Sequence, residues 1–92
     1  MKKTVRITLI KEFEIDIDDS SLTDESLKEF SSYMFMVDKD GLFKYVARSC
    51  FDEDRVFVEG VGEAIPYYAD KDESTVIQFK YLFYDSETEI IE

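Results

Sequence analysis

Carboxylates are the side chains of this sequence whose type and spacing suggest a function. Four of them occupy every second position early in the chain, and three more do so near its end. These two acidic rows are Glu12, Glu14, Asp16 and Asp18, and Asp85, Glu87 and Glu89. In an extended strand that rises about 3.3 Å per residue, the members of a row stand about 6.6 Å apart on one face, a spacing comparable to that of successive phosphates in a nucleic-acid strand. The rows predict a surface that imitates a phosphate backbone, and the alternative is that each is an ordinary solvated strand face.

Two further groups of residues are candidates for contact with a partner. Asp52, Glu53 and Asp54 form an acidic turn, and Tyr67 and Tyr68 are adjacent aromatic residues. Tyrosine is enriched among the residues that dominate binding energy at protein interfaces. We therefore include all five as candidate partner-binding residues, with burial in the core as the alternative for the two tyrosines.

The net charge restricts the class of partner. The 92 residues include 22 acidic and 11 basic ones, which gives a formal net charge of -11. Such a charge repels phosphate backbones and anionic lipids, and it attracts basic proteins through long-range steering. We expect a basic nucleic-acid-binding protein as partner, and no direct binding to nucleic acid or membrane. The alternative is that the acidity only keeps a small protein soluble.

The composition argues against an enzyme and against a bound metal or cofactor. Histidine is absent and Cys50 is the only cysteine, so neither an imidazole base nor a cysteine pair is present. The acidic turn at residues 38–41 lacks the ligand spacing of a calcium loop, and Gly60 and Gly62 lack the third glycine of a phosphate loop. We expect a protein without catalytic activity, with Cys50 as a small buried apolar residue.

Hydrophobic periodicity predicts the secondary structure. Apolar residues alternate with polar ones over residues 5–18, which predicts a strand. Thr23 is placed to cap a helix that runs to about Met36, and Asp38 or Asp40 to cap a second helix that reaches Cys50. Further strands are expected at residues 55–59, at residues 63–69 as a short edge strand, and at residues 75–84 as a central strand, with a bulge or bend at residues 60–62.

These elements predict one α+β domain: an antiparallel sheet of three or four strands with two helices packed on one face, in the order strand, helix, helix, strand, strand, strand. Nine residues are expected in its core: Ile7, Leu9, Ile15, Phe30, Met34, Val46, Phe57, Ile77 and Phe79. No apolar block is long enough for a signal peptide or a membrane span. We therefore expect a soluble protein of a bacterial cytoplasm.

Short segments in the middle of the chain carry a resemblance to known proteins. They are Glu29-Phe30, Tyr33-Met34, Val37-Asp38, Leu42, Tyr45, Ala47-Arg48 and Phe57-Val58-Glu59-Gly60-Val61-Gly62. Over roughly residues 25 to 63 the chain resembles small phage and prophage proteins, some of which are encoded among anti-CRISPR and other anti-defence genes. The resemblance implies an origin in a mobile element, and it transfers no site residue.

The charge argument and the resemblance favour the same function. A row of spaced carboxylates can occupy a lysine- and arginine-lined groove in place of phosphate. The leading hypothesis is an inhibitor of a host defence system, with a CRISPR surveillance complex as target and a restriction enzyme as the next choice. The competing hypothesis is a structural or assembly protein of a phage or mobile element whose acidity is incidental.

Overall fold

The chain folds as a small α+β domain with the predicted order of elements. The structure, a computed structural model, describes residues 1–51 and 56–92. Their elements are β1 (Val5–Ile17), the short 3-10 helix η1 (Asp19–Ser21), α1 (Asp24–Tyr33), α2 (Lys39–Ser49), β2 (Val56–Val58), β3 (Gly62–Pro66) and β4 (Thr75–Ile90). In the described part, no helix is both long and apolar enough to span a membrane.

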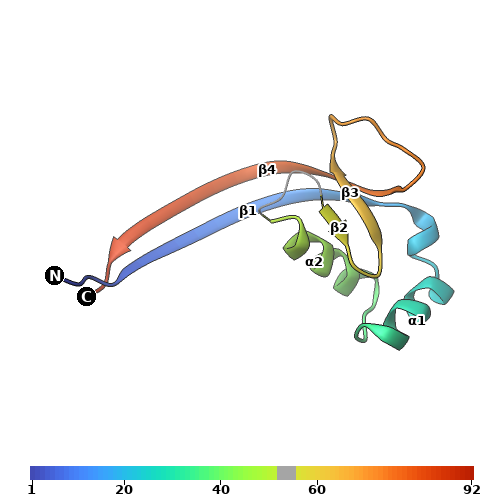
Figure 1. Cartoon of the computed structure of the whole chain (residues 1–92), viewed down its shortest axis with the longest axis horizontal. Helices are drawn as coiled ribbons and strands as arrows, with labels where there is room; N and C mark the ends of the chain where they lie inside the picture. The colour runs from blue at the N-terminus through green and yellow to red at the C-terminus, as the bar shows by residue number, and fades with distance from the viewer. Residues whose placement is uncertain (52–55) are drawn as a thin grey trace.

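A long antiparallel ribbon of β1 and β4 dominates the shape. The two strands pair from Val5 opposite Ile90 to Ile17 opposite Ile77, with a bulge after Glu12. The ribbon curves, the helices lie on its concave side, and one end projects beyond them (Figure 1). We call the projecting part, residues 5–11 and 84–90, the arm. The molecule consequently measures 54 Å along its longest axis against 19 Å along its shortest.

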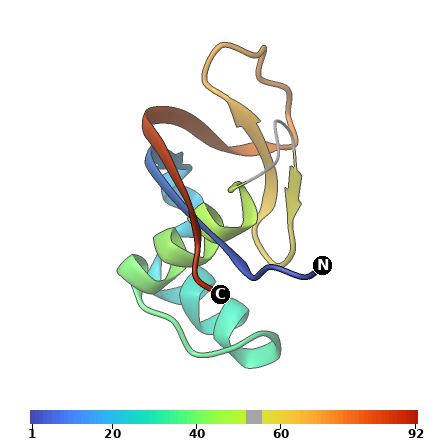
Figure 2. The same cartoon turned by 90° about the vertical axis from the view of Figure 1, so that its left-hand side faces the viewer.

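The sheet is mixed, which corrects the antiparallel sheet expected from the sequence. Its strand order is β1-β4-β3-β2, and β3 pairs with β4 in parallel. The loop of residues 67–74 makes this possible, because its eight residues can span more than the length of the five-residue β3 (Figures 1 and 2). The strand predicted at residues 63–69 as an edge strand is therefore an interior strand, β3. It tolerates Pro66 because this proline is its last residue.

The helices begin as predicted and close the core against the ribbon. The Thr23 side chain accepts a hydrogen bond from the backbone N–H of Ser26 at 3.1 Å, and Asp38 accepts one from Gly41 at 2.7 Å. Helix α1 ends three residues before the predicted Met36. The chain turns there and places the Phe35 ring edge-on against Phe30, with 5.3 Å between centroids.

The core lies under only one half of the ribbon. Of the nine expected core residues, Phe30, Val46, Ile77 and Phe79 are buried, and Ile15 and Met34 are partly buried against them. Burial was wrongly predicted for three: Ile7, Leu9 and Phe57 are exposed. Ile7 and Leu9 lie in the arm, beyond the helices, and Phe57 alternates with the buried Val58 on a strand of three residues.

The bend predicted at residues 60–62 is the turn that joins β2 to β3. Gly60 has a φ of +83°, a conformation that favours glycine. A Cβ atom at Gly60 would also lie 2.7 Å from the Phe30 ring. The turn therefore packs directly on α1 and holds the short β2–β3 hairpin against the helix.

Candidate protein-binding surface

The pairing of β1 with β4 determines which side chains share a face of the ribbon. Residues directly opposite each other in an antiparallel pair point to the same side. Ile17 and Ile77 are such a pair, and both are buried with the helices, so they mark the core face. The neighbouring pair, Asp16 and Gln78, therefore marks the opposite side, which we call the outer face.

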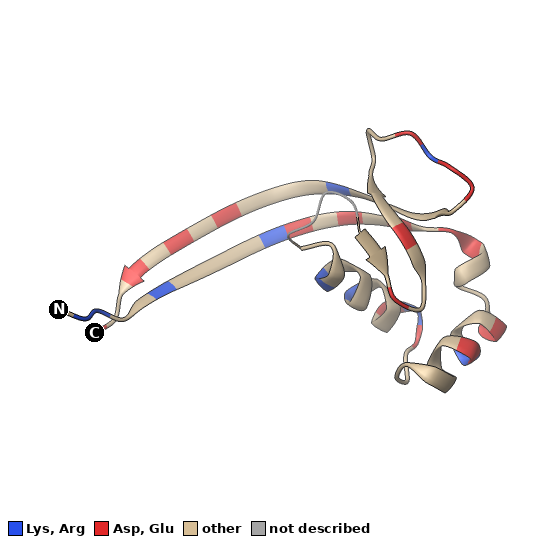
Figure 3. Cartoon of the chain, in the orientation of Figure 1, with Lys and Arg blue, Asp and Glu red and all other residues tan. Residues whose placement is uncertain are grey.

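Six carboxylates of the two predicted rows lie on the outer face of this one ribbon, and all of them are exposed. They are Glu12, Glu14, Asp16, Asp85, Glu87 and Glu89. The three from β1 occupy the half beside the core, and the three from β4 occupy the arm (Figure 3). Glu12 faces Phe83 and Asp85 faces Ile10, so the series passes from one strand to the other at the bulge. We call this series the acidic line.

Strand pairing keeps the charges of the acidic line apart. No carboxylate of the line stands directly opposite another, which avoids the most destabilising arrangement of like charges in a sheet. Basic residues face two of them: Arg6 contacts Glu89 at 3.1 Å, and Lys80 stands opposite Glu14. An exposed ion pair of this kind is typically worth less than about 1 kcal/mol. The outer face therefore retains a strong negative charge over the length of the ribbon.

Asp18 does not belong to the acidic line, although the sequence pattern placed it in the first row. It follows the last residue of β1 and caps η1. Its carboxylate accepts hydrogen bonds from the backbone N–H and the hydroxyl of Ser20 at 3.0 and 2.8 Å. The backbone hydrogen bond, followed by that of the hydroxyl, lowers the pKa of Asp18. The carboxylate of Asp18 thus stabilises the turn of η1, which lies at the edge of the candidate surface.

Tyr67 and Tyr68 are exposed, so the alternative of a core position is wrong for both. Their rings meet edge to face with centroids 5.6 Å apart, in the loop that follows β3. The Lys80 ammonium lies 5.2 Å from the centre of the Tyr67 ring. Tyr67 also lines a shallow hollow of about 260 Å³ with Glu14 and Asp16. The tyrosine is therefore continuous with the acidic line at the end near the core.

The third candidate group cannot be placed in this surface. Asp52, Glu53 and Asp54 lie outside the described residues. The basic residues Arg6 and Lys80 were missed, because only the pairing of β1 with β4 brings them to the outer face.

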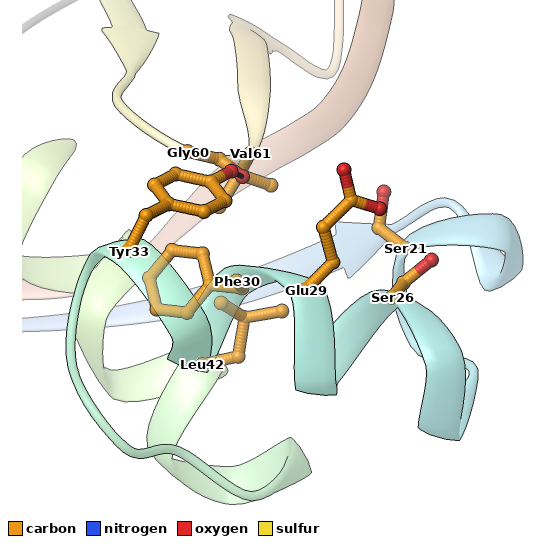
Figure 4. Close-up of a pocket in the computed structure, with 8 residues that line it drawn as sticks. All are labelled: Ser21, Ser26, Glu29, Phe30, Tyr33, Leu42, Gly60 and Val61. Carbon is orange, nitrogen blue, oxygen red and sulfur yellow. Dashed lines mark hydrogen bonds between the residues drawn. The ribbon is translucent and has the colours of Figure 1, made fainter.

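One of several hollows in the described part of the chain lies beside α1, near polar groups. It has a volume of about 170 Å³ between α1 and the turn at Gly60 and Val61, with Glu29, Ser21 and Ser26 along one side (Figure 4). Pockets for small molecules usually measure about 300–1,000 Å³, so this hollow is too small for most of them. An open groove of about 640 Å³ lies between α1 and the start of α2. Burial raises the pKa of the Cys50 thiol to about 11, so this cysteine is protonated at neutral pH. The described residues also contain no group of three or more potential metal ligands.

The most distinctive feature of the described surface is the row of exposed carboxylates in the acidic line. Comparisons with models of known protein families, with curated proteins and with solved structures find no match.

Proposed function

We propose that this protein binds the basic nucleic-acid groove of a host defence protein and excludes nucleic acid from it. The observation that carries the proposal is the acidic line, which joins the carboxylates of β1 and β4 on one exposed face. Steps of about 6.6 Å along a strand and about 7–8 Å between diagonal neighbours give a line roughly 35 Å long. A groove lined with lysine and arginine binds such a line through the interactions that it offers to phosphates.

The shape of the molecule supports the same function. The outer face is the convex side of the ribbon, away from the helices, so a partner can approach along its whole length (Figure 1). Tyr67 at one end supplies an exposed aromatic ring beside Glu14 and Asp16. Aromatic anchors contribute strongly to binding when they enter a pocket of the partner.

The kind of target follows from the resemblance to phage and prophage proteins. Some of those proteins are encoded among anti-CRISPR genes, so we propose a CRISPR surveillance complex in a bacterial cytoplasm as the target, with a restriction enzyme as the next candidate. The proposed mode of action is occupation of the groove, with no catalytic step and no cofactor. The protein itself would not bind DNA or RNA, even in a gel shift at low salt, where any electrostatic affinity is greatest.

The test measures how well the protein displaces target DNA from purified surveillance complexes. The variant combines Glu12→Gln, Glu14→Gln, Asp16→Asn, Asp85→Asn and Glu87→Gln. We expect it to lose displacement by about 100-fold or more, since each exposed contact contributes up to about 1 kcal/mol. Inhibition by the unmodified protein should weaken steeply as salt rises.

A matched control separates the position of the charges from their number. It neutralises five exposed acids away from the ribbon: Glu25, Glu29, Asp40, Asp70 and Glu73. Both variants carry the same net charge, so only the ribbon variant should lose activity. Equal losses would show that net charge alone acts, and unchanged displacement by the ribbon variant would refute the acidic line as the binding surface.

A role in the assembly of a phage or mobile element is the second candidate function. The observation that favours it is the apolar core face of the arm, where Ile7 and Ile90 are exposed. Capture of virion proteins with no effect on any surveillance complex or restriction enzyme would select this candidate over the first.

A further inference from the structure

The arm carries a second surface on the side opposite the acidic line. Alternate residues of β1 and β4 place apolar side chains on the core face of the arm. They are Val5, Ile7, Leu9, Tyr84 and Ile90. All five are exposed, with 64% of Ile7 and 67% of Ile90 open to solvent. These residues, here called the apolar strip, extend the core face past the helices (Figure 1).

The apolar strip is also free of negative charge. The other residues on this face of the arm are Lys11, Ser86 and Thr88, so none of its eight positions is acidic. Lys11 directs its ammonium group toward the body of the domain, where it donates a hydrogen bond to the Phe51 carbonyl at 2.5 Å and lies 4.5 Å from the centre of the Phe51 ring. In a chain with a net charge of -11, this is a surface that a second acidic molecule can approach.

A two-stranded ribbon with exposed apolar side chains is marginally stable in water by itself. We propose that the apolar strip packs against the apolar strip of a second copy of this chain, so that two arms stack face to face in a symmetric dimer. Stacked sheets pack about 10 Å apart, with their side chains interdigitated. Each copy would then cover the apolar strip of the other copy, as the helices cover the core half of each ribbon.

The size of the strip agrees with a dimer interface. A standard interface buries about 800 Å² per partner, of which about 56–65% is apolar. The strip presents on the order of 500 Å² of accessible apolar surface. This area comes from five large apolar side chains, each more than two-fifths exposed, and from the aliphatic stems of the polar residues between them. A two-fold interface needs one self-complementary patch, and the strip provides it.

Charge favours a second copy in this arrangement as well. Stacking through the core faces turns both acidic lines outward, so the carboxylates of the two copies stay on opposite sides of the stack. The dimer would present two acidic lines without placing either in the interface. This inference does not depend on the function of those lines.

The test is the mass of the 92-residue chain in solution, measured by sedimentation equilibrium over a range of concentrations and salt. We expect twice the chain mass of 10.8 kDa, with tighter association at high salt because screening reduces the repulsion between acidic copies. Ile7→Lys and, separately, Ile90→Lys should raise the dissociation constant at least about tenfold, because each buries an unpaired ammonium group.

Ile10→Lys is the matched control, because Ile10 is an exposed isoleucine of the same strand as Ile7 but lies on the outer face, opposite Asp85. It should leave the dimer intact, and circular dichroism should show that all three variants are folded. A monomer at every concentration, a dimer that dissociates as salt rises, or equal weakening by Ile10→Lys would overturn the proposal. Masses well above two copies would also overturn it, since they indicate open-ended pairing of strand edges.

Discussion

The division of the ribbon into a packed half and a projecting half predicts unequal effects from the same substitution. Ile77 is fully buried on the core half of β4, opposite Ile17, whereas Ile10 is 50% exposed on the arm. Both are isoleucines in strands, so replacement by alanine removes the same three carbon atoms and the same intrinsic strand preference. The difference between Ile77→Ala and Ile10→Ala therefore compares the packing of the core face with that of the outer face of the arm.

The expected magnitudes follow from burial. Each buried methylene group contributes about 0.8 kcal/mol, so half-burial of the Ile10 atoms predicts a loss of about 1 kcal/mol. Ile77→Ala adds the cost of a cavity and should lose about 3 kcal/mol, within the usual range of about 2–5 kcal/mol. In a domain of this size these losses lower Tm by roughly 5 °C and 15 °C respectively.

The assay is urea unfolding followed by circular dichroism, with wild type, Ile10→Ala and Ile77→Ala compared at one protein concentration. The slope of free energy against urea should stay constant, so that the midpoints report stability. Equal losses in the two variants would contradict the division, because they would mean that the arm is packed as tightly as the core. Ile10 lies on the outer face, so association through the apolar strip does not disturb the comparison.

Two further predictions concern the core and the helix ends. The pKa of the buried Cys50 thiol is about 11 in the fold against 9.0 for a free thiol. The free energy of unfolding therefore keeps the full contribution of this thiol below pH 9, and it decreases by roughly 2–3 kcal/mol as pH rises toward 11. Urea titrations from pH 8 to 11 should show this loss in wild type beyond that of Cys50→Ala, and parallel curves would contradict it. Asp38→Ala should cost about 0.5–2 kcal/mol by removing the cap of α2, whereas Asp38→Ser should restore most of it in thermal melts.

Local patterns in the sequence determine the elements of this protein. The alternation in residues 5–18 corresponds to β1, and the caps at Thr23 and Asp38 begin the helices where the sequence placed them. These features depend on residues close together in the chain, and their physical causes act over one or two turns. The burial of Cys50 was predicted in the same way, from its place on the apolar side of α2.

Only the tertiary structure decided how the elements are arranged. The pairing of β1 with β4 joins residues at least 60 positions apart, and no local pattern encodes it. This pairing extends β4 to Ile90, brings the two acidic rows onto one face, and leaves Ile7 and Leu9 uncovered beyond the helices. Alternation shows that one face of a strand is apolar. Whether that face is buried depends on which elements reach it, and here the helices reach only half of the ribbon.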